Sequence, residues 1–247
     1  MTYKFDDKYI GYPLIEDVVA APTNLRDLPI SPGSIVRAED PVWGPGEFIF
    51  ARANGSIRLY GLCVLTPVYD ATNQTMQQNM TEVPNTANLG RPVYVYQGKT
   101  ALTSGQYGWF MFVGVSPING TATVAADTIV GITAAGQIGA NSAGKAMLGA
   151  RCAIAASNTL VKAGVGASGD NYIYFPGGTA GFFVGGYLSG TGVGASAIIS
   201  EVNANNVKVT VVNSAAIAGN VTQTANNATI FYNIVAMNSA QAQGPIT

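Results

Sequence analysis

Short apolar runs, each about the length of a β-strand, constrain the fold of this chain more than any other feature of its sequence. The clearest are residues 91–96 (RPVYVY) and residues 107–115 (YGWFMFVGV), which are rich in aromatic and β-branched side chains. Similar runs recur along the chain, separated by glycine, proline and asparagine. No long stretch repeats its apolar residues with the 3.6-residue period of a helix. The sequence therefore predicts an all-β protein, built as an antiparallel β-barrel or sandwich.

Two predicted strands follow each other closely near residue 55. Residues 47–53 (EFIFARA) and residues 56–66 (SIRLYGLCVLT) are separated by Asn54 and Gly55. Asn-Gly is strongly preferred in two-residue hairpin turns, because both central positions of such a turn need a positive φ. The sequence therefore predicts a β-hairpin at this point. The polar residues 70–89 that follow fit either a long loop or a short helix.

The N-terminal part of the chain differs from the rest. Residues 1–40 contain repeated prolines and place aromatic residues among charged ones, which predicts an extended N-terminal arm. Such an arm would lie on its own β domain or on a neighbouring molecule, and a first strand followed by a surface loop is the alternative interpretation. Residues 41–157 are expected to form the main β domain. There, strands at 121–133 and 148–156 are joined by a Gly/Ala-rich connection.

Residues 158–247 predict a second, small region that is rich in β-hairpins. Flexible glycine-rich connections at 163–169 and 176–181 accompany three strand-like runs, residues 182–188, 197–202 and 207–212. Residues 229–237 (TIFYNIVAM) predict a last strand, which we expect to return to the main domain, because only a polar tail follows it.

Charge and hydropathy argue against several kinds of partner. Only 10% of the residues are charged, the net charge is −1 and no Lys/Arg cluster occurs, so no nucleic-acid partner is expected. No apolar run approaches the roughly 18 residues of a membrane span, and the N-terminus lacks the apolar core of a signal peptide. We therefore expect no membrane partner and synthesis in the cytoplasm. The low charge fits a surface covered by other subunits or one covered by Asn, Thr, Ser and Gln.

The residues that usually carry out catalysis or bind metals are scarce. The chain has no histidine, which removes the usual general base near neutral pH and imidazole metal sites. Pairs of carboxylates occur only between sequence neighbours, whose side chains point to opposite faces of a strand. Cys63 and Cys152 lie in apolar runs and are expected to be buried thiols. No catalytic, cofactor-binding or metal-binding residue is therefore predicted, and the chain is not expected to be an enzyme.

Two glycine motifs approach nucleotide-binding patterns and fall short of them. Residues 139–146 fit GxxxxGK, but Ala146 stands where the magnesium-binding Ser or Thr belongs. Residues 190–195 fit GxGxxA, but no acidic residue follows about 20 positions later. We interpret both motifs as turns, in which glycine adopts a positive φ at little cost.

The aromatic residues fall into two groups. Those of the central strands are interpreted as core or subunit interface rather than as a sugar-binding platform; they are Tyr94, Tyr96, Tyr107, Trp109, Phe110 and Phe112. Those of the arm and of the turn after it are candidates for contact with another protein; they are Tyr3, Phe5, Tyr9, Tyr12 and Trp43.

The sequence pattern of residues 90–215 resembles that of virion structural proteins of tailed bacteriophages, in particular head decoration (cement) proteins. The resemblance lies in the pattern GQYGW…NGTATVAADT…GITAAGQIGANSAGK and in the later unit GTGVGASAIISEVNANNVKVTV. It implies a homotrimer on the outer surface of the phage head that binds the major capsid protein and stabilises contacts between capsid subunits. A phage fibre or receptor-binding (host-adhesion) protein is the alternative. A virion-associated polysaccharide depolymerase is disfavoured by the scarcity of grouped carboxylates.

Overall fold

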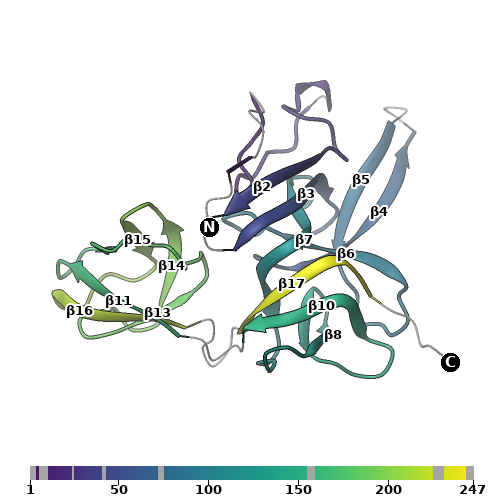
Figure 1. The fold of residues 1–247 in the computed structure, drawn as a ribbon. Coiled ribbons are helices and arrows are strands. Elements are labelled where there is room, and N and C mark those ends of the chain that lie inside the picture. The colour runs from purple at the N-terminus through teal and green to yellow at the C-terminus, as the bar shows by residue number, and fades with distance from the viewer. Residues whose placement is uncertain are drawn as a thin grey trace. The chain divides into compact units, whose positions relative to one another are not determined.

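The chain folds into two compact units. A computed structural model describes residues 4–5, 11–23, 25–40, 43–71, 75–154, 159–224 and 231–242. One unit is formed by Thr2–Ala155 with Tyr232–Thr247, and the other by Ala156–Phe231. Both consist of β-strands (Figure 1). Across the described ranges the only helical element is a 3₁₀ turn, η1 (Leu25–Asp27), so the all-β prediction is confirmed.

The larger unit is built on one sheet of eleven strands. Along the sheet the order is β1-β2-β3-β5-β4-β6-β17-β10-β8-β9-β7. Strand β7 also pairs with β3, β6 and β17, so the sheet curls back on itself. Neighbouring strands are antiparallel except for two short parallel pairings, β3–β5 and β7–β9. The strands are β1 (Lys4–Phe5), β2 (Ile35–Asp40), β3 (Gly44–Ala53), β4 (Leu62–Asp70), β5 (Thr75–Glu82), β6 (Arg91–Tyr96), β7 (Tyr107–Gly120), β8 (Ile129–Ala134), β9 (Gln137–Ala140), β10 (Ala146–Ile154) and β17 (Phe231–Ala242).

Strands β3 and β7 form the centre of this unit, and both of their faces are buried. On one face Phe50 lies opposite Trp109, with ring centroids 5.2 Å apart, and it stacks on Tyr107 at 5.8 Å. On the other face Ile49 and Phe110 belong to a second cluster of buried residues. A strand that is covered on both sides reads as a continuous apolar run rather than as an alternating one. This explains the sequences EFIFARA and YGWFMF.

Two expectations for residues 54–89 are wrong. Asn54-Gly55 does not close a hairpin, because β3 pairs with β2, β5 and β7 and not with β4. Residues 70–89 are neither a long loop throughout nor a short helix, since β5 pairs antiparallel with β4 over Thr75–Glu82. The hairpin that forms is β4–β5, which inserts β5 between β3 and β4.

The last strand lies in the larger unit. Strand β17 follows the second unit in the sequence, and within the sheet it pairs with β10, β6 and β7. The connection predicted at residues 134–145 contains one further strand, β9, which pairs with β8 over Gln137–Ala140.

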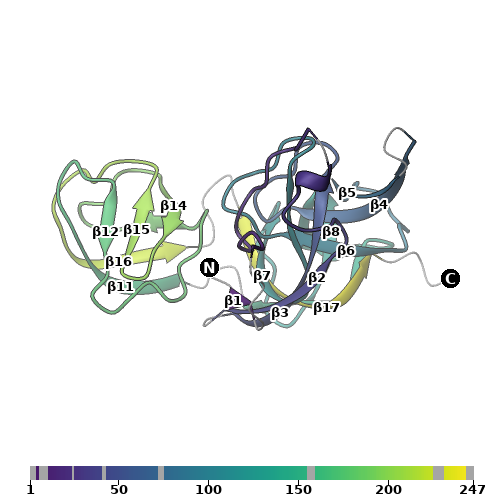
Figure 2. The same ribbon diagram turned by 90° about the horizontal axis from the view of Figure 1, so that it is seen from above.

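The smaller unit is a closed barrel of six antiparallel strands (Figure 2). The order around the barrel is β11-β12-β15-β14-β13-β16, and β16 pairs with β11 over eight residue pairs to close it. The interior is apolar and includes Ile173, Phe175, Leu188 and Val221. The strands are β11 (Thr159–Gly166), β12 (Tyr172–Tyr174), β13 (Tyr187–Ser189), β14 (Ala197–Val202), β15 (Asn206–Val209) and β16 (Ile217–Thr224).

The prediction of a glycine-rich connection at residues 163–169 is wrong for residues 163–166, which belong to β11. A Cβ on Gly164 would lie 3.0 Å from Val221 Cγ2 and 3.1 Å from Ile173 Cγ2, which is closer than such atoms normally approach. Glycine is therefore needed here so that the strands can approach each other around the core, rather than for flexibility.

The buried thiol of Cys63 and phenol of Tyr96 predict that stability falls at alkaline pH. Burial raises the pKa of both groups above their usual values. Their stabilising contribution is therefore complete below the unfolded-state pKa values, about 8.5 and about 10, and it is lost as the pH rises above them. Between pH 8 and pH 11 we expect the free energy of unfolding to fall by up to about 1.4 kcal/mol per pH unit, above about pH 8.5 for Cys63 and above about pH 10 for Tyr96. Urea titrations across this range measure it.

The matched control is the double variant Cys63→Ala with Tyr96→Phe, which lacks both ionisable groups. Its unfolding free energy should depend less steeply on pH over the same interval. If the unfolding free energies of the two proteins fell equally steeply with pH, the assignment of this pH dependence to Cys63 and Tyr96 would be contradicted.

The barrel closes on its own core, which predicts that it folds without the rest of the chain. A fragment comprising residues 156–231 should give dispersed amide resonances and a cooperative thermal transition. Random-coil spectra for this fragment would contradict the division into two units. A fragment of residues 2–155, which lacks β17, is the contrasting case and should be unstable.

Candidate interaction surfaces

The described aromatic residues of the N-terminal segment pack on the larger unit itself. Phe5 lies 6.5 Å from Tyr12 and 6.0 Å from Trp109 between ring centroids, and both contacts are edge-on. The Trp109 indole Nε1 donates a hydrogen bond to the carbonyl of Pro13 at 3.1 Å. Residues 11–23 and 25–40 therefore lie on their own β domain, which is one of the alternatives for this arm. The candidates Tyr3 and Tyr9 lie outside the described residues.

Further backbone contacts anchor the same segment. Val19 and Tyr107 exchange backbone hydrogen bonds at 2.9 and 2.8 Å, and Lys99 forms an ion pair with Glu16 at 3.2 Å. Ile15 is fully buried. Residues 11–23 therefore cover the aromatic face of β3 and β7, and their removal would expose it to water.

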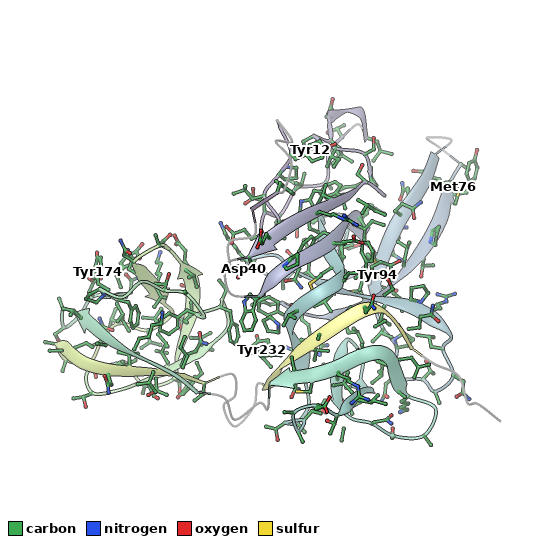
Figure 3. All side chains as sticks on the ribbon, viewed as in Figure 1. Tyr12, Asp40, Met76, Tyr94, Tyr174 and Tyr232 are labelled. Atoms are coloured by element: carbon green, nitrogen blue, oxygen red, sulfur yellow. The ribbon has the colours of Figure 1, made fainter. Side chains whose placement is uncertain are left out.

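The fifth candidate, Trp43, lies at the turn between β2 and β3. Its backbone amide donates a hydrogen bond to Asp40 Oδ1 at 3.0 Å, and its side chain is half-buried. Figure 3 places Asp40 at this end of the strand pair and Tyr12 in the N-terminal segment. Of the three described candidates, Phe5 and Tyr12 therefore contact each other, and Trp43 lies at the β2–β3 turn.

The central aromatic residues are mostly core, as expected. Tyr96, Tyr107, Trp109 and Phe110 are buried. Tyr94 and Phe112 are half-buried and meet edge-on at 6.1 Å. Burial raises the pKa of Tyr94, Tyr107 and Tyr232 as well, so these phenols stay protonated well above neutral pH.

Both glycine motifs are turns. Residues 141–145 connect β9 to β10, and the ammonium of Lys145 donates to Asn85 Oδ1 at 2.7 Å. The second motif precedes β14, and a Cβ on Gly192 (φ +85°) would lie 2.7 Å from the carbonyl oxygen of Ala216. A strand, not a helix, follows each motif, so neither has the strand–loop–helix form of a phosphate-binding site.

Both cysteines are buried and neither forms a disulfide, which confirms that expectation. Within the described ranges, no three His, Cys, Asp or Glu side chains come close enough together to hold a metal ion. The helical structure in those ranges includes nothing of the length and apolarity needed to cross a membrane.

The outer end of the β4–β5 hairpin exposes apolar side chains that the sequence did not mark. Val68, Tyr69 and Met76 are 42%, 59% and 55% exposed. Figure 3 shows Met76 at this end of the hairpin. Beside it, a groove of about 360 Å³ lies between β5 and residues 25–32. Residues 75–82 (TMQQNMTE) carry no apolar alternation that would have marked β5, and the pairing with β4 alone identifies it as a strand.

A second apolar surface lies on the outside of the barrel. Val161 and Val165 of β11 and Tyr174 of β12 are about half exposed. Val165 is the register partner of Tyr174 on one side and of Ala218 of β16 on the other. Figure 3 shows Tyr174 on the barrel. The exposed outward side chains of these three strands form the barrel face, which comprises Val161, Ala163, Val165, Tyr174, Ala218 and Asn220.

Comparison of the chain with protein-family models, with curated proteins and with solved structures returned no match in any of the three.

Substitutions distinguish the aromatic residues that build the core from the apolar residues available for contact. Trp109→Ala should lower the free energy of unfolding by about 3–5 kcal/mol, because it leaves a cavity beside Phe50. Met76→Ser, on the exposed hairpin, should change it by no more than about 0.5 kcal/mol. Urea denaturation measures both, and a large loss for Met76→Ser would refute its assignment as surface.

Proposed function

We propose that this chain is a non-enzymatic structural protein of a tailed-phage particle, which decorates the outer surface of the head and stabilises contacts between major capsid proteins. The sequence resemblance over residues 90–215 supports the setting. The two β units and their exposed apolar surfaces support a role in binding other proteins. Its partners would be the major capsid protein and further copies of the chain, with a homotrimer as the expected assembly.

The observation that carries the proposal is the barrel face. Its outward side chains are small, β-branched, aromatic or amide-bearing, and none of them is charged. A neighbouring subunit can cover such a surface without removing an ion from water, which would be costly. The two lysines in the strands of this unit each contact another group. Lys162 donates to the carbonyl of Gly178 at 2.9 Å, and Lys208 lies 5.7 Å from the Tyr172 ring centroid.

The mechanism is thermodynamic. A protein that binds the assembled lattice better than it binds free capsid subunits shifts the equilibrium toward the lattice by mass action. Repetition of the same contact over a symmetric shell makes individually weak contacts strong together, because each bound subunit holds its neighbours near their sites. No group in this mechanism has to transfer a proton or act as a nucleophile.

A fibre or receptor-binding protein of the same particle is the second candidate. It is favoured by the closed barrel, which has its own core and is suited to act as a separate recognition module. Copy number separates the two functions. Hundreds of copies in each purified particle fit a shell protein, whereas a handful at one vertex fit a fibre and would rule out decoration.

The double variant Val161→Glu with Val165→Glu tests the barrel face directly. Both side chains are exposed, so the variant should fold normally. We expect its binding to heads purified without this chain to fall at least about tenfold in co-sedimentation, because burial of two carboxylates is costly. Ser200→Glu, an exposed position on β14, is the matched control and should bind like the wild type. Undiminished binding by the double variant would overturn the role of this face.

A further inference from the structure

Strand β5 is paired along one edge and largely unpaired along the other. On one side all eight of its residues pair with β4. On the other side only Asn79 and Met80 pair, in parallel, with Arg52 and Ala53 of β3. Among the described residues no further strand pairs with β5, so Thr75–Gln78 present an open edge. Backbone N–H and C=O groups along such an edge form a template for one more strand.

The open edge faces the groove beside the hairpin. One wall of the groove is Met76, Gln77 and Gln78 of β5, and the opposite wall includes Leu25, Leu28 and Pro32. Gly33 approaches the Gln78 side chain at one end of this edge, since an added Cβ there would lie 3.2 Å from Gln78 Cγ. Leu25 and Leu28 are only half-buried and Met76 is exposed, so the groove offers apolar side chains on both sides.

The charges at the groove are balanced within the chain. The Arg52 guanidinium Nη1 donates to Gln77 Oε1 at 3.1 Å. The amide nitrogen of the same Gln77 donates to Asp70 Oδ2 at 2.6 Å. These two hydrogen bonds link the Arg52 cation to the Asp70 anion through the neutral amide of Gln77. The groove therefore favours an occupant without charge over an acidic or a basic one.

We propose that the open edge of β5 is a docking site for an extended, uncharged segment of another polypeptide chain. The segment adds a strand beside Thr75–Gln78 and places alternate apolar side chains against Leu25, Leu28 and Met76. A four-residue match spans about 13 Å at the rise of a β-strand. Backbone hydrogen bonds hold the segment, and the apolar walls select its side chains. The identification of that chain as a subunit of a phage head rests on the function proposed above, whereas the docking site itself does not.

The probe is the acetylated and amidated peptide Gly-Thr-Val-Thr-Ile-Thr-Gly, titrated into the full-length ¹⁵N-labelled protein. We expect the amide resonances of Thr75–Gln78 to shift and their hydrogen exchange to slow at about millimolar peptide. The control peptide Gly-Pro-Val-Pro-Ile-Pro-Gly keeps the apolar residues but lacks three of the backbone donors. It should leave these amides unchanged. No effect of the first peptide at Thr75–Gln78, or an equal effect of both peptides, overturns the proposal.

The variant Leu28→Asp places a charge in the groove and should weaken binding of the first peptide at least about tenfold. Val212→Asp, at an exposed position outside both the groove and the barrel face, is the matched control and should bind the peptide normally. Unchanged peptide affinity in Leu28→Asp, with its fold verified by its spectrum, overturns the site.

Two measurements on the wild type separate this inference from the proposed function. If the wild type binds the peptide at β5 but no copies are found on heads, the function fails and the docking site stands. If the protein decorates heads and Thr75–Gln78 exchange equally fast in the free and bound states, the docking site fails and the function stands.

Discussion

The pairing of β3 with β7 is the constraint on which the larger unit depends. Phe50 and Trp109 fill one face of this pair, and Ile49 and Phe110 fill the other. A strand pair buried on both faces needs cover on both sides, since aromatic side chains left in water forfeit most of their stabilising contribution. The N-terminal segment supplies cover on the Trp109 side through Phe5, Tyr12 and the carbonyl of Pro13. The described residues 11–23, which the sequence marks as part of an extended arm, therefore cover the core of this unit.

The sequence predicted those strands whose pattern is local. The runs that became β6, β7 and β14 are rich in aromatic or β-branched residues, and the structure contains each of them. Pairing between strands was beyond this kind of reasoning. Asn54-Gly55 has the composition of a hairpin turn, yet β5 takes the position beside β3 and displaces β4. Turn composition sets a local backbone preference, whereas the choice of partner depends on burial across the whole sheet.

The predictions for β11 and β5 were wrong because their glycine and glutamine residues were taken as signs of irregular structure. In β11, Gly164 was read as a flexible connection, although a larger residue there would collide with Val221 in the barrel core. In β5, Gln77 and Gln78 were read as part of a long loop or a short helix, although a strand that is unpaired along part of one edge can carry polar side chains. The candidate contact residues were also chosen by residue type alone, without knowledge of burial. Aromatic character drew attention to Phe5 and Tyr12, which serve their own unit, and away from Val165 and Met76, which are exposed.

The sequence has few charged residues, and the structure exposes two β surfaces suited to contact with other chains, the barrel face and the open edge of β5. Both would be covered in an assembly, and both would be left in water in an isolated chain. A reconstruction of the purified phage particle at a resolution that separates β-strands tests this most directly. The account predicts that the barrel face of each copy lies against a neighbouring subunit on the outside of the head. Copies whose barrel face is open to solvent, or a head without this chain, would contradict it.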